Sequence, residues 1–420
     1  MNAFDKIIGY EGIKIELTQL CDILQHRERY EKLGAKLPQG LLIYGKPGMG
    51  KTLMANCLIE SSGLKAYTIR KNRGGNTLME SINNVFDEAK RNSPSIVFID
   101  DMDKFANEDN SHCVAQEYIA IQSKIDEING SDVFVIATVN DKDKLPDSLL
   151  RSGRFDRKIK VALPSDEDSE EIVKHYLKTK KISKDINYED ITKMICYNSC
   201  AELETILNEA AINAGFAKRD SICTEDILEA VLRIEYNAPK LSLRTTSEQF
   251  RKTAIHEAGH VVICEVLCQG SVGIASIRSS SKSYAEGFVR RCKEFPNRSC
   301  DTLISLGGKV ATELYYPEEN ASGCRTDIRR ALKNIRKEIT ELGTCGIGMI
   351  DASIHGYNVT ENLNTRVEAI AYAELEKSIL KVRDILIKNR VFLEKVIDGM
   401  IEKETLLYSD IQALRCGVKG

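Results

Sequence analysis

The stretch Leu41-Leu42-Ile43-Tyr44-Gly45-Lys46-Pro47-Gly48-Met49-Gly50-Lys51-Thr52 decides the fold of the first part of this 420-residue chain. A short apolar run, typical of a buried β-strand, leads directly into the pattern Gly-x4-Gly-Lys-Thr and then into a helical stretch. Glycines in such a loop let backbone amides surround phosphates, while the lysine reaches the β- and γ-phosphates and the threonine hydroxyl binds Mg²⁺. The stretch therefore predicts a nucleotide site rather than a simple turn.

Two further apolar runs in the first part of the chain also end in polar residues. Residues 95–99 lead into Asp100-Asp101, and residues 133–139 lead into Asn140. A carboxylate at the end of a buried strand can hold Mg²⁺, and the Asn140 amide is placed to orient an attacking water. Because helical stretches separate the three runs, we expect a doubly wound parallel sheet with the nucleotide at the carboxyl ends of its strands.

A second motif, His256-Glu257-Ala258-Gly259-His260, lies in a run whose apolar spacing predicts a helix. Residues four apart on a helix lie one above the other, so the two imidazoles point the same way and supply half of a tetrahedral zinc site. Glu257 is then placed to take a proton from the attacking water. The alternative is a pair of ordinary histidines on a helix, but the chain has only six His, which favours the metal site.

The local sequence does not identify a third zinc ligand. Glu265 is too close to the motif, and Glu286 follows a serine-rich patch rather than a clear helix. Cys264 and Cys268 continue the four-residue ladder, but we interpret them as buried apolar thiols, because a first-shell thiolate suits a closed structural zinc better than a catalytic one. A more distant carboxylate must complete the site, and the chain offers several.

Composition excludes several classes of protein. The 59 basic and 62 acidic residues give a net charge of −3, so the chain has no basic surface for nucleic acid. Thirteen cysteines, without any Cys-x-x-Cys, indicate reduced thiols. No apolar run approaches the ~18 residues of a membrane span, and no signal-peptide pattern opens the chain. We therefore expect a soluble, cytoplasmic protein of two or three domains.

The segment Leu149-Leu150-Arg151-Ser152-Gly153-Arg154-Phe155-Asp156-Arg157 follows the last of the apolar runs. Arginines clustered at the edge of a sheet can simply be solvated. They can also be fingers that stabilise the γ-phosphate bound by a neighbouring subunit. Residue pattern alone leaves these two interpretations open.

Taken together, these segments resemble the FtsH family, in which an AAA+ ATPase is fused to a zinc metallopeptidase. The likeness extends from about Phe4 to the C-terminus and follows the family's order of motifs. Besides the stretches already quoted, the matching segments are Ile8-Gly9, Lys32-Leu33-Gly34, Asn208-Glu209-Ala210-Ala211, Gly307-Gly308-Lys309 and Ser322-Gly323-Cys324-Arg325-Thr326-Asp327.

The resemblance implies a homo-hexameric ring that binds ATP, Mg²⁺ and Zn²⁺ and acts on polypeptides. It implies Asp327 as the third zinc ligand, and Arg154 and Arg157 as fingers acting on the neighbouring subunit. It also implies that Ile8 and Gly9 lie near the adenine. Asp100 would bind Mg²⁺, and Asp101 would polarise the attacking water. The nucleotide-binding residues implied are Ile8, Gly9, Gly45, Lys46, Pro47, Gly48, Met49, Gly50, Lys51, Thr52, Asp100 and Asn140.

The departures from the family pattern concern mainly the ATPase. Asp101 replaces a glutamate, so its carboxylate sits back by roughly 1.5 Å, a displacement that could slow hydrolysis by around a hundredfold. Ser199-Cys200-Ala201-Glu202 replaces Ser-Gly-Ala-Asp, and Asn129-Gly130-Ser131 replaces an intersubunit Asp-Gly-Phe. The pore-loop Phe-Val-Gly has no counterpart in residues 69–76, which are basic and lack an aromatic. The family usually carries membrane-spanning helices before the ATPase, whereas this chain begins almost directly at it, so we expect either a soluble protein or one whose anchor has been removed.

We therefore expect a multi-domain protein: an α/β P-loop AAA+ domain with a helical lid, followed by a mostly α-helical zinc peptidase. The predicted limits are 1–163 for the large nucleotide-binding subdomain, 164–236 for the lid, 237–248 for a linker and 249–420 for the peptidase. The predicted function is an ATP-dependent zinc endopeptidase that degrades unfolded or weakly folded proteins. The alternatives are an ATP-gated peptidase without strong unfolding activity, and a nucleotide-switched remodelling scaffold.

Overall fold

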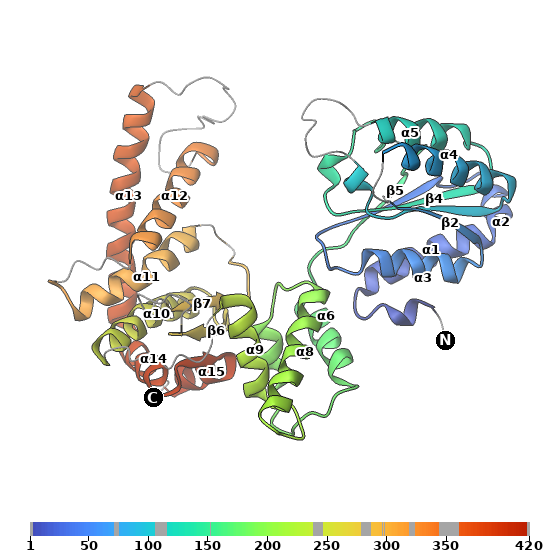
Figure 1. Ribbon diagram of the computed structural model, residues 1–420. Coiled ribbons are helices and arrows are strands. Elements are labelled where there is room, and N and C mark those ends of the chain that lie inside the picture. Colours follow the sequence, from blue (N-terminus) through green and yellow to red (C-terminus); the bar gives the residue numbers. More distant parts are fainter. Residues whose placement is uncertain are drawn as a thin grey trace. The chain divides into compact units, whose positions relative to one another are not determined.

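The computed structural model describes residues 3–70, 75–105, 116–151, 153–237, 247–278, 287–295, 297, 299–318, 324–343 and 361–417. Two compact units make up the chain (Figure 1). The first contains residues 1–179 and 197–205, and the second contains residues 180–196 and 206–420. The predicted lid is divided between these units, and the predicted domain limits stay a prediction.

A five-stranded parallel sheet forms the centre of the first unit, as the alternation of apolar runs and helical stretches predicts. The strand order is β2-β3-β4-β1-β5, and every neighbouring pair is parallel. The strands are β1 (Gly40–Tyr44), β2 (Lys65–Ile69), β3 (Ser95–Ile99), β4 (Val133–Val139) and β5 (Arg157–Lys160). Because β3, β4 and β1 are adjacent, the polar residues that follow them meet at one edge of the sheet.

Helices cover both faces of this sheet (Figure 1). One face carries α1 (Glu11–Gln25) and α3 (Lys51–Ser62), and the other carries α4 (Gly75–Arg91) and α5 (Gln116–Glu127). The mainly apolar strands β3 and β4 are fully buried between these layers, as expected for a parallel sheet. The remaining elements of this part are η1 (Ala3–Lys6), α2 (Arg27–Glu31), η2 (Met102–Phe105), η3 (Lys142–Lys144) and α6 (Asp166–Leu177).

Helices α7 (Tyr188–Met194), α8 (Cys200–Phe216) and α9 (Thr224–Tyr236) follow α6. The first turn of α8 belongs to the first unit, whereas α7, the rest of α8 and α9 belong to the second. Asn187 caps α7 by accepting hydrogen bonds from the amides of Glu189 and Asp190. Thus several helices that the sequence groups with the ATPase belong to the same compact unit as the peptidase.

The C-terminal part of the second unit is mostly helical and is built around α10 (Ser247–Leu267), which carries the His-Glu-x-x-His motif. Helix α10 packs against α11 and α14. The other helices are α11 (Ser299–Tyr315), α12 (Arg325–Glu341), α13 (Glu361–Lys388), α14 (Arg390–Lys403) and α15 (Tyr408–Cys416). A parallel sheet covered by helices, followed by a mostly helical part, agrees with the predicted fold class.

A small antiparallel sheet of order β7-β6-β8 completes the second unit. Its strands are β6 (Val272–Ser276), β7 (Phe288–Arg291) and β8 (Thr405–Leu407). From sequence alone, residues 273–277 and 287–289 predict two short strands flanking the active cleft, and β6 and β7 form there, whereas nothing predicts β8. Among the described residues, none of the helices combines the length and apolar character of a membrane span.

Candidate functional site

The phosphate loop lies between β1 and α3, in the strand–loop–helix context that the sequence predicts. Gly45, Gly48 and Gly50 have φ values of 152°, 75° and 82°, which side chains rarely adopt. The Lys51 ammonium, only 5% exposed, donates hydrogen bonds of 2.8 Å to the carbonyls of Gly45 and Lys46 and to Asn140 Oδ1. Burial lowers the pKa of Lys51, and the nearby carboxylates of Asp101 and Asp100 counteract this effect.

A set of oxygen ligands suited to Mg²⁺ lies beside the loop. Thr52 Oγ1 donates to Asp100 Oδ1 at 2.9 Å, and Thr138 Oγ1 donates to the same oxygen at 2.8 Å. The other carboxylate oxygen of Asp100 lies 3.4 Å from Arg70 Nη2, at the end of β2. Thr138 was not predicted as part of the site, although a polar residue within an otherwise apolar strand is a usable signal. The predicted pair of Thr52 and Asp100 does converge, and it offers a hydroxyl and a carboxylate to the ion.

Asp101 lies next to this cluster in a left-handed conformation with φ 52°. Its amide donates to Thr138 Oγ1 at 2.9 Å, and its carboxylate accepts a 2.6 Å hydrogen bond from Lys104. Both members of this ion pair are partly exposed, so the pair is weak and can exchange. The role of Asp101 in polarising water stays a prediction.

A cavity of about 300 Å³ opens beside the phosphate loop within the first unit. Ile8 lines it, and the role predicted for Ile8 and Gly9 near the adenine stays a prediction. Gly9 packs against α6, where a Cβ on it would lie 2.7 Å from Asp168 Oδ1. The prediction missed a group of lining residues contributed by α6 and the first turns of α8: Ile172, His175, Tyr176, Cys200, Ala201 and Glu204. Burial raises the pKa of Tyr176 to about 12, so its hydroxyl stays protonated at neutral pH.

In the second unit, the three predicted zinc ligands converge. His256 Nε2 and His260 Nε2 are 3.2 Å apart, and they lie 3.0 and 3.3 Å from Asp327 Oδ2. A tetrahedral zinc with bonds of about 2.0 Å holds its donor atoms roughly 3.3 Å apart. The donor spacing and the chemistry of two imidazoles and one carboxylate therefore fit a zinc ion with one position left for water or substrate.

The second nitrogen of each imidazole has its own partner. The Nδ1 of His260 lies 2.7 Å from the carbonyl oxygen of Ile304, and the Nδ1 of His256 lies 3.8 Å from the Cys324 thiol. Cys324 is 2% exposed and directly precedes α12, which carries Asp327 in its first turn. Such outer partners fix the ring orientation that leaves Nε2 free for metal.

Without a bound metal, hydrogen bonding between the ligands shifts the pKa values of His256 and Asp327. Burial lowers the pKa of His256, but hydrogen bonds to Asp327 and Cys324 outweigh burial and raise this pKa to about 10. Burial raises the pKa of Asp327, but hydrogen bonds from the two histidines leave it below its usual range. The metal-free site therefore holds a proton on His256 beside an ionised Asp327.

Glu257 is 5% exposed and lies against the start of β7. A Cβ at Gly287 would lie 2.4 Å from Glu257 Cγ and 2.5 Å from the carbonyl oxygen of Ser276. Only glycine leaves room for the Glu257 side chain at this position. The predicted general base is thus packed beside an edge strand of the small sheet.

Three glycines allow α10 and α11 to approach closely. A Cβ at Gly259 would lie 2.3 Å from the Gly307 carbonyl oxygen, and one at Gly308 would lie 2.5 Å from His256 Nε2 and 2.6 Å from His260 Nε2. The sequence indicated residues 307–308 only through the family resemblance. Their physical role is to bring the α11 backbone directly against the zinc-binding nitrogens.

The residues disfavoured as zinc ligands occupy other environments. Cys264 is completely buried in the peptidase core, and burial raises the pKa of its thiol. Glu265 is also completely buried, but its carboxylate accepts hydrogen bonds from backbone amides. Neither belongs to the metal-ligand group found among the described residues.

The two predicted arginine fingers have different surroundings in the isolated chain. Arg154 forms two 2.9 Å hydrogen bonds to the Asp126 carboxylate and also contacts the Ser148 carbonyl. Arg157 is exposed on β5. The pore segment 71–74, the connector 238–246 and Ser322-Gly323 lie outside the described residues.

Comparisons with known proteins identify two family segments. Residues 41–163 match the ATPase family associated with various cellular activities, and residues 243–414 match peptidase family M41. Similar proteins include the ATP-dependent zinc metalloproteases FtsH of Mycoplasma mobile, Caldicellulosiruptor bescii and Ureaplasma parvum. The identities are 30%, 29% and 30% over 99%, 98% and 97% of this chain. The chain spans 63%, 72% and 60% of the length of these relatives.

Proposed function

Because this chain belongs to the FtsH family, as its sequence motifs indicated, we propose that it is an ATP-dependent zinc endopeptidase working as a hexameric ring. The convergence of His256, His260 and Asp327 beside the buried Glu257 is the observation that carries this proposal. All four side chains needed for metal-assisted peptide hydrolysis are present. This argues against a purely scaffolding role.

The chemistry follows from these side chains. A zinc ion held by the three ligands would polarise the scissile carbonyl and lower the pKa of a water molecule. Glu257 removes the proton of that attacking water and later returns a proton to the leaving amine. Strand β7 has β6 as its only neighbour in the described sheet, so an extended substrate can pair with its other edge through main-chain hydrogen bonds. Such pairing reads little sequence and suits broad specificity.

The nucleotide site would supply the energy for feeding substrate to the peptidase. Lys51 and the loop amides bind the phosphates, Thr52 and Asp100 hold Mg²⁺, and Asn140 orients the attacking water. Asp101 would polarise this water. Arg157 and Arg154 would act on the nucleotide of the neighbouring subunit.

The decisive experiment for the peptidase is Glu257→Gln in zinc-loaded protein. Zinc content should stay stoichiometric, and cleavage of an unstructured peptide should fall by ~10² to 10⁴, the usual effect of removing a general base. Asp327→Asn is the matched variant, and it should lose zinc instead. Near-normal cleavage by zinc-loaded Glu257→Gln would show that the proposed mechanism is wrong.

A second candidate is an ATP-gated peptidase that cleaves unfolded chains without forceful unfolding. The absence of an aromatic from residues 69–76 favours it, because a ring grips a chain through large, rigid side chains. Unfolding a stable domain means overcoming roughly 5–15 kcal/mol of cooperative structure. We expect degradation rates to fall steeply across a series of tagged domains of increasing stability, measured with ATP, ADP and a slowly hydrolysed analogue. Rates that stay flat up to the most stable domain would favour the unfolding motor.

A further inference from the structure

Helix α9, the last helix of the predicted lid, packs against the hairpin formed by β6 and β7. Arg278, just after β6, forms a bidentate pair with Glu229 of α9 through hydrogen bonds of 2.7 and 2.8 Å. The Arg278 side chain is only 7% exposed, so this pair is shielded from solvent. A planar guanidinium joined to a carboxylate by two bonds fixes orientation as well as distance.

A second buried ion pair joins the same helix to β7. Arg290 donates to Glu235 of α9 and also to the backbone carbonyl of Cys196. The side chains of Arg290 and Glu235 are 14% and 16% exposed. Because residues two apart on a strand lie on the same face, Phe288 points the same way as Arg290. The Phe288 ring stacks on Tyr236, with centroids 3.5 Å apart and planes 8° apart.

The two ion pairs lie on either side of the segment that joins β6 to β7: Arg278 is two residues past β6, and Arg290 is the third residue of β7. Arg278 is the last described residue before this segment, and Gly287, one position before β7, is the first after it. Gly287 is also the residue that packs against Glu257. Helix α9 therefore holds the residues directly after β6 and also β7, the strand that begins beside the general base.

We propose that α9 positions the β6–β7 hairpin for catalysis, with Arg290 as a positioning residue of the peptidase. This inference rests on the proposed peptidase function. It means that α9 supports the substrate-binding strand. Loss of the Arg290–Glu235 pair lets β7 move away from its place, which weakens substrate pairing and displaces Glu257.

The test compares Arg290→Ala with Arg291→Ala in the full chain. Arg291 is the matched control because it lies on the opposite face of the same strand and pairs with the half-exposed Asp301. For an unstructured reporter peptide, we expect Arg290→Ala to raise KM and lower kcat, so that kcat/KM falls by about tenfold or more. Arg291→Ala should change kcat/KM by less than about threefold. Zinc content should be equal in both variants.

Hydrogen exchange supplies a measurement that does not depend on cleavage. In Arg290→Ala, the amides of residues 287–291 should exchange faster, while those of α14 should not change. If this variant fails to fold, the charge swap of Glu235→Arg with Arg290→Glu, and separately Tyr236→Leu, replace it. The swap should restore part of the activity and protection lost in Arg290→Glu alone, and Tyr236→Leu should reproduce a milder loss.

Unchanged kcat/KM together with unchanged exchange in a zinc-loaded Arg290→Ala would overturn the inference. An inactive wild-type protein with full zinc would instead contradict the proposed function, and the exchange comparison would still decide whether α9 holds β7. The two failures are therefore distinguishable.

Discussion

Gly308 shows how one missing side chain can permit a metal site. Its α-carbon faces the nitrogens of His256 and His260 that would bind zinc, and a methyl group there would lie within 2.6 Å of both. Contacts this short require the imidazoles or the α11 backbone to move. The site geometry leaves no such freedom, because Ile304 and Cys324 fix the rings from behind.

We therefore predict that Gly308→Ala weakens zinc binding by 10- to 100-fold, comparable to the loss of an outer-shell partner. Zinc affinity can be measured by competition with a chelator. Gly215→Ala is the control, since a Cβ at this helical position meets nothing within 4 Å and should stabilise α8 slightly. Wild-type zinc affinity in Gly308→Ala would contradict this account of the site.

Proton release on zinc binding is a second prediction at this scale. The pKa of His256 is raised from 6.5 to about 10 in the metal-free protein. This proton contributes stability that is fully present below pH 6.5 and is lost as the pH rises through about 10. Zinc needs the neutral imidazole, so apparent zinc affinity should rise about tenfold per pH unit between pH 7 and 9. Calorimetry in buffers of different ionisation enthalpy should detect about one proton released, whereas no release would contradict the assignment.

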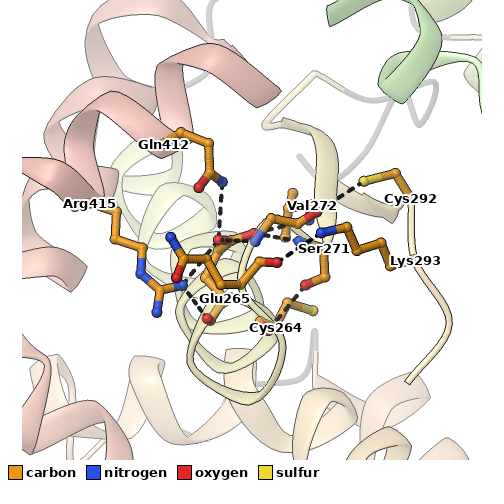
Figure 2. Close-up of polar contacts among 10 residues, drawn as sticks. Cys264, Glu265, Ser271, Val272, Cys292, Lys293, Gln412 and Arg415 are labelled. Carbon is orange, nitrogen blue, oxygen red and sulfur yellow. Dashed lines mark hydrogen bonds and ion pairs between the residues drawn. The ribbon is translucent and has the colours of Figure 1, made fainter. Parts of the chain in front are cut away.

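At the scale of elements, the buried carboxylate of Glu265 joins α10 to β6 and α15 (Figure 2). It accepts hydrogen bonds of 2.9–3.0 Å from the consecutive amides of Gly270, Ser271 and Val272 at the start of β6. Gln412 and Arg415 of α15 donate to it from the other side. One side chain thus satisfies a tight turn and fixes the C-terminal helix.

We predict that Glu265→Gln lowers the free energy of unfolding of the peptidase by about 3–5 kcal/mol, the usual cost of breaking a buried ion pair. The substituted amide also presents donors to a pocket lined with donors. Glu394→Gln is the control, because its pair with Arg390 is exposed and should contribute less than about 1 kcal/mol. The measurement is thermal unfolding at matched zinc content. Equal destabilisation of the two variants would show that the buried Glu265 contributes no more to stability than the exposed Glu394.

At the scale of the whole molecule, the exposed Arg157 is the better placed of the two proposed fingers. Arg154 is bound to Asp126 within its own chain and would have to break that bidentate pair to reach a neighbouring nucleotide. An exposed guanidinium can contact a neighbour without this cost. Arg154 therefore joins the segment before β5 to α5 within its own chain.

We predict that Arg157→Ala spares ATP binding but suppresses hydrolysis by ~10³ or more, because a finger stabilises charge on the neighbour's nucleotide. Lys158→Ala, an exposed cation next along β5, is the control and should hydrolyse ATP normally. Mixing Arg157→Ala with Lys51→Ala subunits should restore some turnover at mixed interfaces. Hydrolysis at the wild-type rate by isolated monomers would contradict a ring mechanism.

The sequence by itself determined the features that depend on local geometry. The Gly-rich loop requires its glycine conformations wherever it occurs, and a four-residue spacing places His256 and His260 on one helical face in any fold. Alternating apolar runs and helices likewise predicted the parallel sheet, because parallel strands buried on both faces require nearly continuous apolar sequences.

Only the tertiary structure decided what depends on packing between distant segments. Three such features bring together residues far apart in the sequence, and no periodic pattern predicts them. They are the approach of Asp327 to the two histidines, the lining of the cavity beside the phosphate loop by α6 and α8, and the hydrogen bonds around Glu265. Family resemblance supplied Asp327, but its approach depends on the packing of α12 against α11 and of α11 against α10. The contact of α9 with β7 is of the same kind, since buried ion pairs and stacked rings form only after both elements are in place.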